Sequence, residues 1–258
     1  MWEENEMSEE EKKVKKTSKI ILILIFVLII AVIGIICAIL YLKSSSFKVT
    51  IDGKSAQGVE NTFIIDEQTG KVYVDIKAFA SYVGYTAHDG EYKVYSQDTN
   101  KCYVESANET ASFFLNSNKI SKVAPDSTED YEDYTISEPV KRENGKLYII
   151  SDGMEKACNL VFSYNKEANS IAIYTLPYLV EQYTQKIIQM GYAGISSDFN
   201  NQKAILYDMF VVQEGTAENT SKENAKYGVI NLKNEEIIAL RYSNIEFSEN
   251  TRRIFCYK

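Results

Sequence analysis

The chain has 258 residues, of which 45% are hydrophobic and 25% are charged, and its formal net charge is −8. Residues 1–43 contain six Glu and six Lys, so the whole excess of negative charge belongs to residues 44–258. A region this acidic repels phosphate backbones, and we therefore expect no nucleic acid partner and no simple attraction to anionic wall polymers.

The first element in chain order is an uncharged apolar segment over residues 20–42. At about 1.5 Å per helical residue it exceeds the roughly 30 Å of hydrocarbon in a bilayer, and it predicts a transmembrane helix. Five lysines precede the segment and only Lys43 follows it closely, which predicts a cytoplasmic tail over residues 1–19 and an extracytoplasmic bulk. A cleaved signal peptide is the alternative, but its apolar core would be about 7 to 15 residues long. The predicted location is the cell membrane, with a single span and the N-terminus in the cytoplasm.

Several strands are predicted by alternation of apolar and polar residues. Phe47, Val49 and Ile51 alternate before a turn at Asp52-Gly53, and the runs KCYVES and ASFFLNS predict two more strands further along. The acidic stretch APDSTEDYEDY that follows is predicted to be a loop.

A block that predicts a strand, then a helix, then a left-handed residue that ends the helix occurs twice in the sequence. The first copy, TGKVYVDIKAFASYVGY, predicts a strand from Val72 to Val74, a helix capped by Asp75 and a left-handed stop at Gly84. The second copy, NGKLYIISDGMEKACNL, predicts a strand from Leu147 to Ile150 and a helix capped by Asp152. In this second copy Glu155 is expected to return the capping bond, and Asn159 takes the place of the glycine. Each helix is expected to lead into a strand, over residues 92–95 and 170–174.

These repeated blocks resemble the copper amine oxidase N-terminal-like domain, also called the stalk domain, of exported Firmicute proteins. The resemblance covers residues 47–175 and implies a small α+β unit in which antiparallel strands wrap helices. Asn159 departs from the family pattern, and so do Ser151 and Asp152, where Pro-Leu-Arg is usual. In the oxidases copper is bound by a different domain, and His88, the single histidine, does not make a three-histidine site. No cofactor is expected.

The remaining sequence predicts a connecting helix and a second β segment. Pro177 fits the first turn of a helix over residues 176–192, and Gly191 stops it. Next, AILYDMFVVQE predicts a buried strand pair. Residues 200–258 then resemble a WG-like repeat through the pair Tyr227-Gly228 and the two strands that follow it.

No assembled catalytic or metal site is recognisable. His88 is expected at the surface in a turn, and Ser163 with Lys166 has S-x-x-K spacing without the helix that this motif needs. The acidic residues near 126–133 lack the glycine and terminal glutamate of a calcium loop. The three cysteines beyond the apolar segment permit one disulfide, Cys102 to Cys158, or three buried thiols, and burial is favoured; these cysteines are Cys102, Cys158 and Cys256.

Aromatic residues are abundant, with 19 tyrosines. Exposed aromatic rings stack on sugars or flank peptide grooves, and the candidate ligand contacts are Tyr82, Tyr85 and Tyr92 near the first helix.

The sequence therefore predicts an α+β fold consisting of a transmembrane helix, an antiparallel β-rich domain with two strand-helix-strand repeats, and a helix with a small antiparallel β segment. The predicted function is that of a non-catalytic extracytoplasmic binding or scaffold module. Cell-wall glycan or an envelope protein is the candidate partner. Two alternatives stay open: a wall-active hydrolase or transferase whose carboxylates meet only in three dimensions, and an extracytoplasmic sensor.

Overall fold

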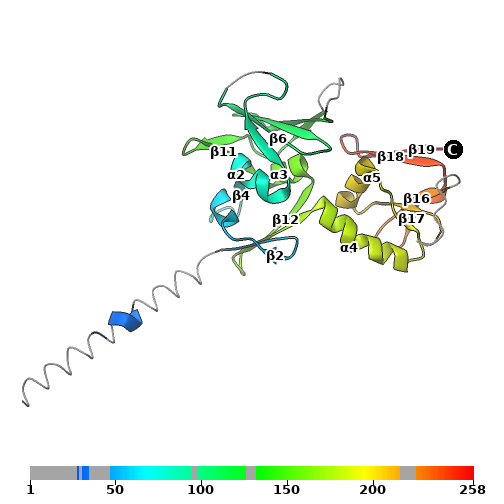
Figure 1. Cartoon of the computed structure of the whole chain (residues 1–258), viewed down its shortest axis with the longest axis horizontal. Helices are drawn as coiled ribbons and strands as arrows, with labels where there is room; N and C mark the ends of the chain where they lie inside the picture. Colours follow the sequence, from blue (N-terminus) through cyan, green and yellow to red (C-terminus); the bar gives the residue numbers. More distant parts are fainter. Residues whose placement is uncertain (1–27, 29–30, 35–46, 95–97, 126–131, 216–224) are drawn as a thin grey trace, which may run out of the picture. The chain divides into compact units, whose positions relative to one another are not determined.

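The structure is a computed structural model. It describes residue 28, residues 31–34 and residues 47–258, except for residues 95–97, 126–131 and 216–224. Residues 48–258 form one compact unit, and Figure 1 shows its strands and helices.

The predicted fold class needs a correction at the transmembrane helix. Most of residues 20–42 lies outside the described residues, and of this range only residue 28 and residues 31–34 are described, as helical and exposed. In the described part of the chain, no helix has both the length and the apolar character needed to cross a bilayer. The described residues form a β-rich α+β unit without that element.

The two repeated blocks meet in one four-stranded sheet, the repeat sheet, with the order β10-β11-β4-β3. Its strands are β3 (Phe63–Ile65), β4 (Val72–Asp75), β10 (Lys141–Glu143) and β11 (Lys146–Ile150). Both predicted repeat strands are confirmed, as β4 and β11.

Strands β4 and β11 pair with each other in antiparallel fashion, with Tyr73 opposite Ile150 and Val74 opposite Ile149. Tyr73 and Tyr148 hold equivalent positions in the two copies, and so do Val74 and Ile149. Exchanging the copies therefore maps the ladder onto itself, which places an approximate twofold axis at the Val74–Ile149 pair.

A helix follows each repeat strand, as predicted. In the first copy, α2 (Ile76–Ala80) is capped by Asp75, whose Oδ1 accepts a hydrogen bond from the Ala78 N–H at 3.1 Å. The 3-10 helix η2 (Ser81–Val83) extends α2, and this helical segment ends at Gly84, which is left-handed with φ of 84°. Local sequence therefore sets both ends of this helix.

The second copy starts differently from the prediction. Helix α3 (Ser151–Cys158) has Ile150 at its N-cap, so Asp152 lies within the first turn and does not cap. Asp152 accepts from the Ser137 N–H at 3.2 Å, and Glu155 accepts from the Phe162 N–H at 2.6 Å instead of returning a capping bond. The predicted left-handed stop at Asn159 is confirmed, with φ of 51°.

Between the copies lies the five-stranded sheet, in which consecutive strands pair antiparallel. Its strands are β5 (Thr86–Asp89), β6 (Lys101–Glu105), β7 (Thr110–Phe114), β8 (Lys119–Val123) and β9 (Glu132–Thr135). The inner face packs against α2 and α3 (Figure 1), and it buries side chains such as Val104, Phe113 and Ile120.

Two predictions in this region are wrong. The strand after α2 is β5, and in residues 92–95 the described part forms only an isolated bridge between Glu91 and Val94. The predicted acidic loop ends early, because Glu132 to Thr135 form the edge strand β9, which pairs with β8.

The opening sheet has the order β12-β13-β1-β2. Its strands are β1 (Lys48–Ile51), β2 (Lys54–Ser55), β12 (Leu160–Asn165) and β13 (Ser170–Thr175). The predicted turn at Asp52-Gly53 is confirmed and joins β1 to β2 in a hairpin, but β1 also pairs with β13 in parallel, an exception to the antiparallel prediction. The Asp52 carboxylate secures this pairing, accepting from the N–H and the hydroxyl of Thr175 at 2.8 and 2.9 Å.

The C-terminal part begins with α4 (Leu176–Gln189), which has Pro177 in its first turn as predicted. A third four-stranded sheet follows, together with a short helix, a 3-10 helix and a final hairpin. These elements are β14 (Gly194–Ile195), α5 (Phe199–Lys203), η3 (Ala204–Tyr207), β15 (Phe210–Gln213), β16 (Tyr227–Ile230), β17 (Glu236–Tyr242), β18 (Asn244–Ser248) and β19 (Arg253–Tyr257). Ile187 of α4 packs into a core cluster with Phe210 and Ile230 of the sheet.

One prediction in the C-terminal part is half wrong. The stretch predicted as a buried strand pair contains a single strand, β15, because its first residues form η3 and Asp208 then takes a left-handed conformation with φ of 56°.

In the Tyr227-Gly228 pair, close packing against the neighbouring strand explains why the second residue is a glycine. A Cβ at Gly228 would lie 2.7 Å from the Ile238 carbonyl oxygen on the neighbouring strand.

Candidate functional site

The three tyrosines predicted as ligand contacts have different surroundings. Tyr82 is exposed, and its hydroxyl lies against Gly58. Tyr92 is half-buried and meets the Tyr103 ring edge-on, with centroids 5.4 Å apart. Tyr85 is buried, and its hydroxyl donates to Glu109 at 3.4 Å, in the interior. Through Glu109, Tyr85 contacts a group of buried charged side chains.

Four buried charged residues form a closed group there, which we call the charge ring: Glu109, Lys122, Lys203 and Glu249. Lys122 Nζ lies 3.2 Å from a carboxylate oxygen of each glutamate. Lys203 Nζ lies 3.4 Å from Glu109 and 3.1 Å from Glu249. Each lysine therefore contacts both carboxylates, and the two positive and two negative charges balance.

The ring joins segments that are far apart in sequence. Glu109 directly precedes β7 and Lys122 lies in β8, whereas Lys203 ends α5 and Glu249 follows β18. The ring thus connects the five-stranded sheet to the C-terminal part of the unit.

Lys122 is held on every side. Besides the two glutamates, its ammonium donates to the Lys156 carbonyl at 2.8 Å and to Asn159 Oδ1 at 3.1 Å. These acceptors lie at the C-terminal end of α3, where the helix dipole favours a cation. The Asn159 amide in turn donates to Glu109, so the residue that stops the second repeat helix also supports the ring.

The pKa shifts of two ring residues, Lys122 and Glu249, favour their charged forms. Burial by itself would lower the pKa of Lys122, but the carboxylates of Glu109 and Glu249 outweigh it and raise this pKa above its usual value. Burial would raise the pKa of Glu249, but Lys122 and Lys203 outweigh it and lower this pKa. Burial also raises the pKa of the nearby Tyr85 phenol. Near neutral pH these three groups do not exchange protons readily.

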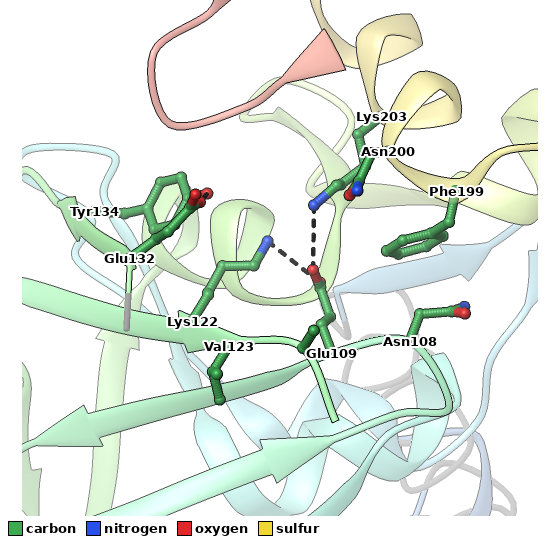
Figure 2. Close-up of a pocket in the computed structure, with 10 residues that line it drawn as sticks. Asn108, Glu109, Lys122, Val123, Glu132, Tyr134, Phe199, Asn200 and Lys203 are labelled. Atoms are coloured by element: carbon green, nitrogen blue, oxygen red, sulfur yellow. Dashed lines mark hydrogen bonds and ion pairs between the residues drawn. The ribbon is translucent and has the colours of Figure 1, made fainter. Parts of the chain in front are cut away.

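A small polar cavity of about 170 Å³ borders the ring. Figure 2 shows the Lys122 and Lys203 side chains converging on the Glu109 carboxylate at its wall. The other labelled residues around the cavity are mostly polar: Asn108, Val123, Glu132, Tyr134, Phe199 and Asn200. Tyr134 donates to Glu132 at 2.8 Å.

The two resolved shifts in the ring move the pKa values of Lys122 and Glu249 away from the neutral range. Catalytic acids, bases and nucleophiles need a pKa matched to their task, whereas the lysine and the carboxylate with resolved shifts hold their charges more firmly than usual. Among the described residues, no group of three or more His, Cys, Asp or Glu side chains is arranged to hold a metal ion.

The other residues singled out in the sequence lie elsewhere. His88 is in strand β5, not in a turn, and it stacks on Tyr103. Ser163 is exposed in strand β12 and Lys166 lies in the turn that follows the strand, so the S-x-x-K spacing has no helix. Glu132 and Asp133 belong to β9, whereas the acidic residues before them lie outside the described residues.

All three cysteines in the described unit are free. The predicted burial is confirmed for Cys102 and Cys158, and burial raises the pKa of the Cys102 thiol to about 12. Cys256 is half-buried.

No family model, no curated protein and no solved structure matches this chain. The resemblances to the stalk domain and to the WG repeat therefore stay predictions, as do the predicted domain boundaries.

Proposed function

We propose that residues 48–258 form a non-catalytic binding or scaffold module of the cell envelope. The observation that carries this proposal is the closure of the charge ring. Each buried lysine contacts both buried carboxylates, and the resolved pKa shifts stabilise the charged forms. A cluster whose charges are satisfied by its own chain fastens the fold and is not poised to transfer protons.

The rival function, hydrolysis of wall glycan, is less well supported by this geometry. A glycosidase needs a carboxylic acid with a raised pKa, opposite a second carboxylate that is free to attack or to activate water. The pKa of Glu249 is instead lowered, and two lysines lie between it and Glu109. The sensor alternative depends on the tail over residues 1–19, which lies outside the described residues.

The location at the envelope, with the bulk of the chain outside the cytoplasm, also stays a prediction from the sequence. Protease digestion of intact protoplasts tests it. Cleavage of residues 48–258 in intact protoplasts is the expected result, and cleavage only after lysis would contradict it.

The non-catalytic function is tested with full-length chain purified in mild detergent and incubated with insoluble peptidoglycan and with washed envelopes. We expect the chain to sediment with one of these fractions and to release neither sugar reducing ends nor amino groups.

The matched variants are Glu249→Gln, within the ring, and Glu246→Gln, an exposed residue of the same hairpin. Product release by the wild type that Glu249→Gln abolishes and Glu246→Gln preserves, at equal folded fraction, would show an enzyme. Absence of sedimentation with both fractions would remove the binding part of the proposal.

A further inference from the structure

The two edges of the final hairpin are treated differently. At the edge of β18, the Asn201 side chain donates to the Ile245 carbonyl at 2.7 Å and accepts from the Phe247 N–H at 2.9 Å. An amide from α5 thus takes the place of a neighbouring strand. At the other edge, β19 pairs with β18 alone among the described strands, and Figure 1 shows it at the rim of the unit, beside the C-terminal end.

The bonds of Asn201 also show which way the β19 backbone points. In an antiparallel pair, two opposite residues turn their N–H and C=O groups either toward each other or both outward. Ile245 and Phe247 turn theirs outward, to Asn201, and they lie opposite Cys256 and Ile254. The N–H and C=O groups of Cys256 and Ile254 therefore point out of the hairpin, and they have no hydrogen bond within the described part of the chain.

The side chains of β19 do not discourage pairing at this open edge. Edge strands of monomeric proteins are commonly protected by charges, prolines or bulges, and all three residues of the edge strand β10 are charged. In β19 the only charged residue is the first, Arg253. Phe255 and Tyr257, on the same face as Arg253, are each 46% exposed. The strand thus offers free backbone groups together with exposed aromatic surface.

We propose that β19 pairs with β19 of a second copy of this chain, antiparallel, about a twofold axis at Phe255. In this register Ile254 lies opposite Cys256 of the second copy, and Cys256 lies opposite Ile254 of the second copy. All the outward N–H and C=O groups of both strands then form hydrogen bonds. An axis at Ile254 or at Cys256 would pair only one of these two residues within the strand, so the axis at Phe255 forms the most hydrogen bonds.

The same register brings complementary side chains together on the exposed face. Phe255 lies directly opposite Phe255 of the second copy, and the two rings remove each other from water. Arg253 lies opposite Tyr257 of the second copy, whose hydroxyl donates to Glu246 at 2.9 Å. A guanidinium is attracted both by that ring and by that carboxylate. This complementarity offsets the repulsion between two acidic chains and identifies a second copy as the occupant.

The pairing joins the two hairpins into one four-stranded sheet with the order β18-β19-β19-β18. A contact between two short strand edges is small, so the dimer is reversible and depends on protein concentration. This inference does not rest on the proposed binding function, and each holds or fails without the other.

Disulfide cross-linking tests the register. The background is full-length protein in mild detergent with Cys37→Ser and Cys256→Ser, which leaves the two buried cysteines. Opposite residues that do not bond through the backbone have Cα atoms about 4.5 Å apart, within the range that a disulfide spans. Phe255→Cys should therefore form a covalent dimer when diamide is added, seen on a non-reducing gel.

The matched control is Tyr257→Cys in the same background. Two copies of residue 257 lie four residues apart along the paired strands, about 14 Å, which is too far for a disulfide. This variant should stay monomeric on the same gel. No cross-link with Phe255→Cys, or equal cross-linking in the two variants, would overturn the inference.

Sedimentation velocity of the full-length protein over a range of concentrations tests the dimer without a cross-link. Phe255→Glu places two like charges opposite each other and should weaken dimerisation about tenfold or more. Ile237→Glu changes an exposed residue of another edge strand, β17, and should dimerise as the wild type does. A wild-type protein that stays monomeric, or a Phe255→Glu variant that dimerises as tightly as the wild type, would contradict the pairing.

Discussion

The two faces of the five-stranded sheet treat buried polar groups in opposite ways. On the inner face, Lys122 carries a full charge and is completely surrounded by acceptors. On the outer face, the Ser112 and Thr110 hydroxyls are neutral and have no partner among the described residues. Leaving a buried charge without a partner costs far more free energy than leaving a neutral hydroxyl without one. The inner face therefore satisfies its charged groups within the chain, whereas the outer face tolerates two neutral hydroxyls without partners among the described residues.

The largest expected effect comes from breaking the charge ring. Lys122→Met leaves an uncompensated carboxylate in the core and should lower the free energy of unfolding by about 3 to 5 kcal/mol. Lys119→Met, at an exposed position of the same strand, should change it by at most about 0.5 kcal/mol. Urea unfolding followed by circular dichroism measures both.

A double variant sharpens this result. Lys122→Met combined with Glu249→Gln restores the charge balance and should recover part of the loss seen with Lys122→Met alone. If the double variant loses more free energy of unfolding than the two single variants lose together, charge balance is not what organises the ring.

A smaller effect is expected from acid. The pKa of Glu249 is depressed in the folded protein, so its contribution to stability is fully present above the unfolded-state pKa, about 4.5, and is lost as pH falls through the lower folded value. Lys122, whose pKa is raised in the folded protein, contributes fully to stability below about pH 10.5, and this contribution is lost only as the pH rises through the higher folded value.

Unfolding curves recorded between pH 7 and pH 3 check the acid limb. Glu249→Gln should show a shallower loss of stability below pH 4.5 than the wild type does. Parallel curves for the two proteins would mean that this carboxylate does not titrate with folding.

The smallest effect distinguishes the outer face. Thr110→Val deletes a hydroxyl without a partner and should leave the free energy of unfolding unchanged or raise it by up to about 1 kcal/mol. Thr62 is equally well buried, but its hydroxyl donates to the Val59 carbonyl at 2.7 Å, so Thr62→Val should lower it by about 1 kcal/mol. Thermal unfolding of the two variants side by side measures the difference. An equal loss in both would show that the Thr110 hydroxyl has a partner in the protein.

Local features were predictable from the sequence, and long-range ones were not. Asp75 and Gly84 fix the first repeat helix through contacts within a few residues, and both were identified. Asp152 was misassigned as a cap because in both copies the N-cap is the last residue of the strand, Asp75 in β4 and Ile150 in β11. Asp152 is therefore the second residue of its helix, and the equivalent of the Asp75 cap is an apolar residue that offers no side-chain acceptor.

The charge ring left one trace in the sequence. In strand β8, Lys122 occupies the same face as Ile120, a position where alternation predicts an apolar residue. That trace indicates a buried lysine but not its partners, because Glu249 is 127 residues away. The pairing of Tyr103 with Ser112 on the outer face was equally hidden, because it depends on the register of β6 and β7.

The parallel pairing of β1 with β13 has a consequence for biosynthesis. The first strand of the unit finds its partner only after Thr175, which is 123 residues beyond Asp52, has left the ribosome. At about 5 to 20 residues per second, this interval lasts roughly 6 to 25 seconds. Until then β1 has an unpaired edge in the nascent chain, so the interval is a window in which a chaperone could bind it.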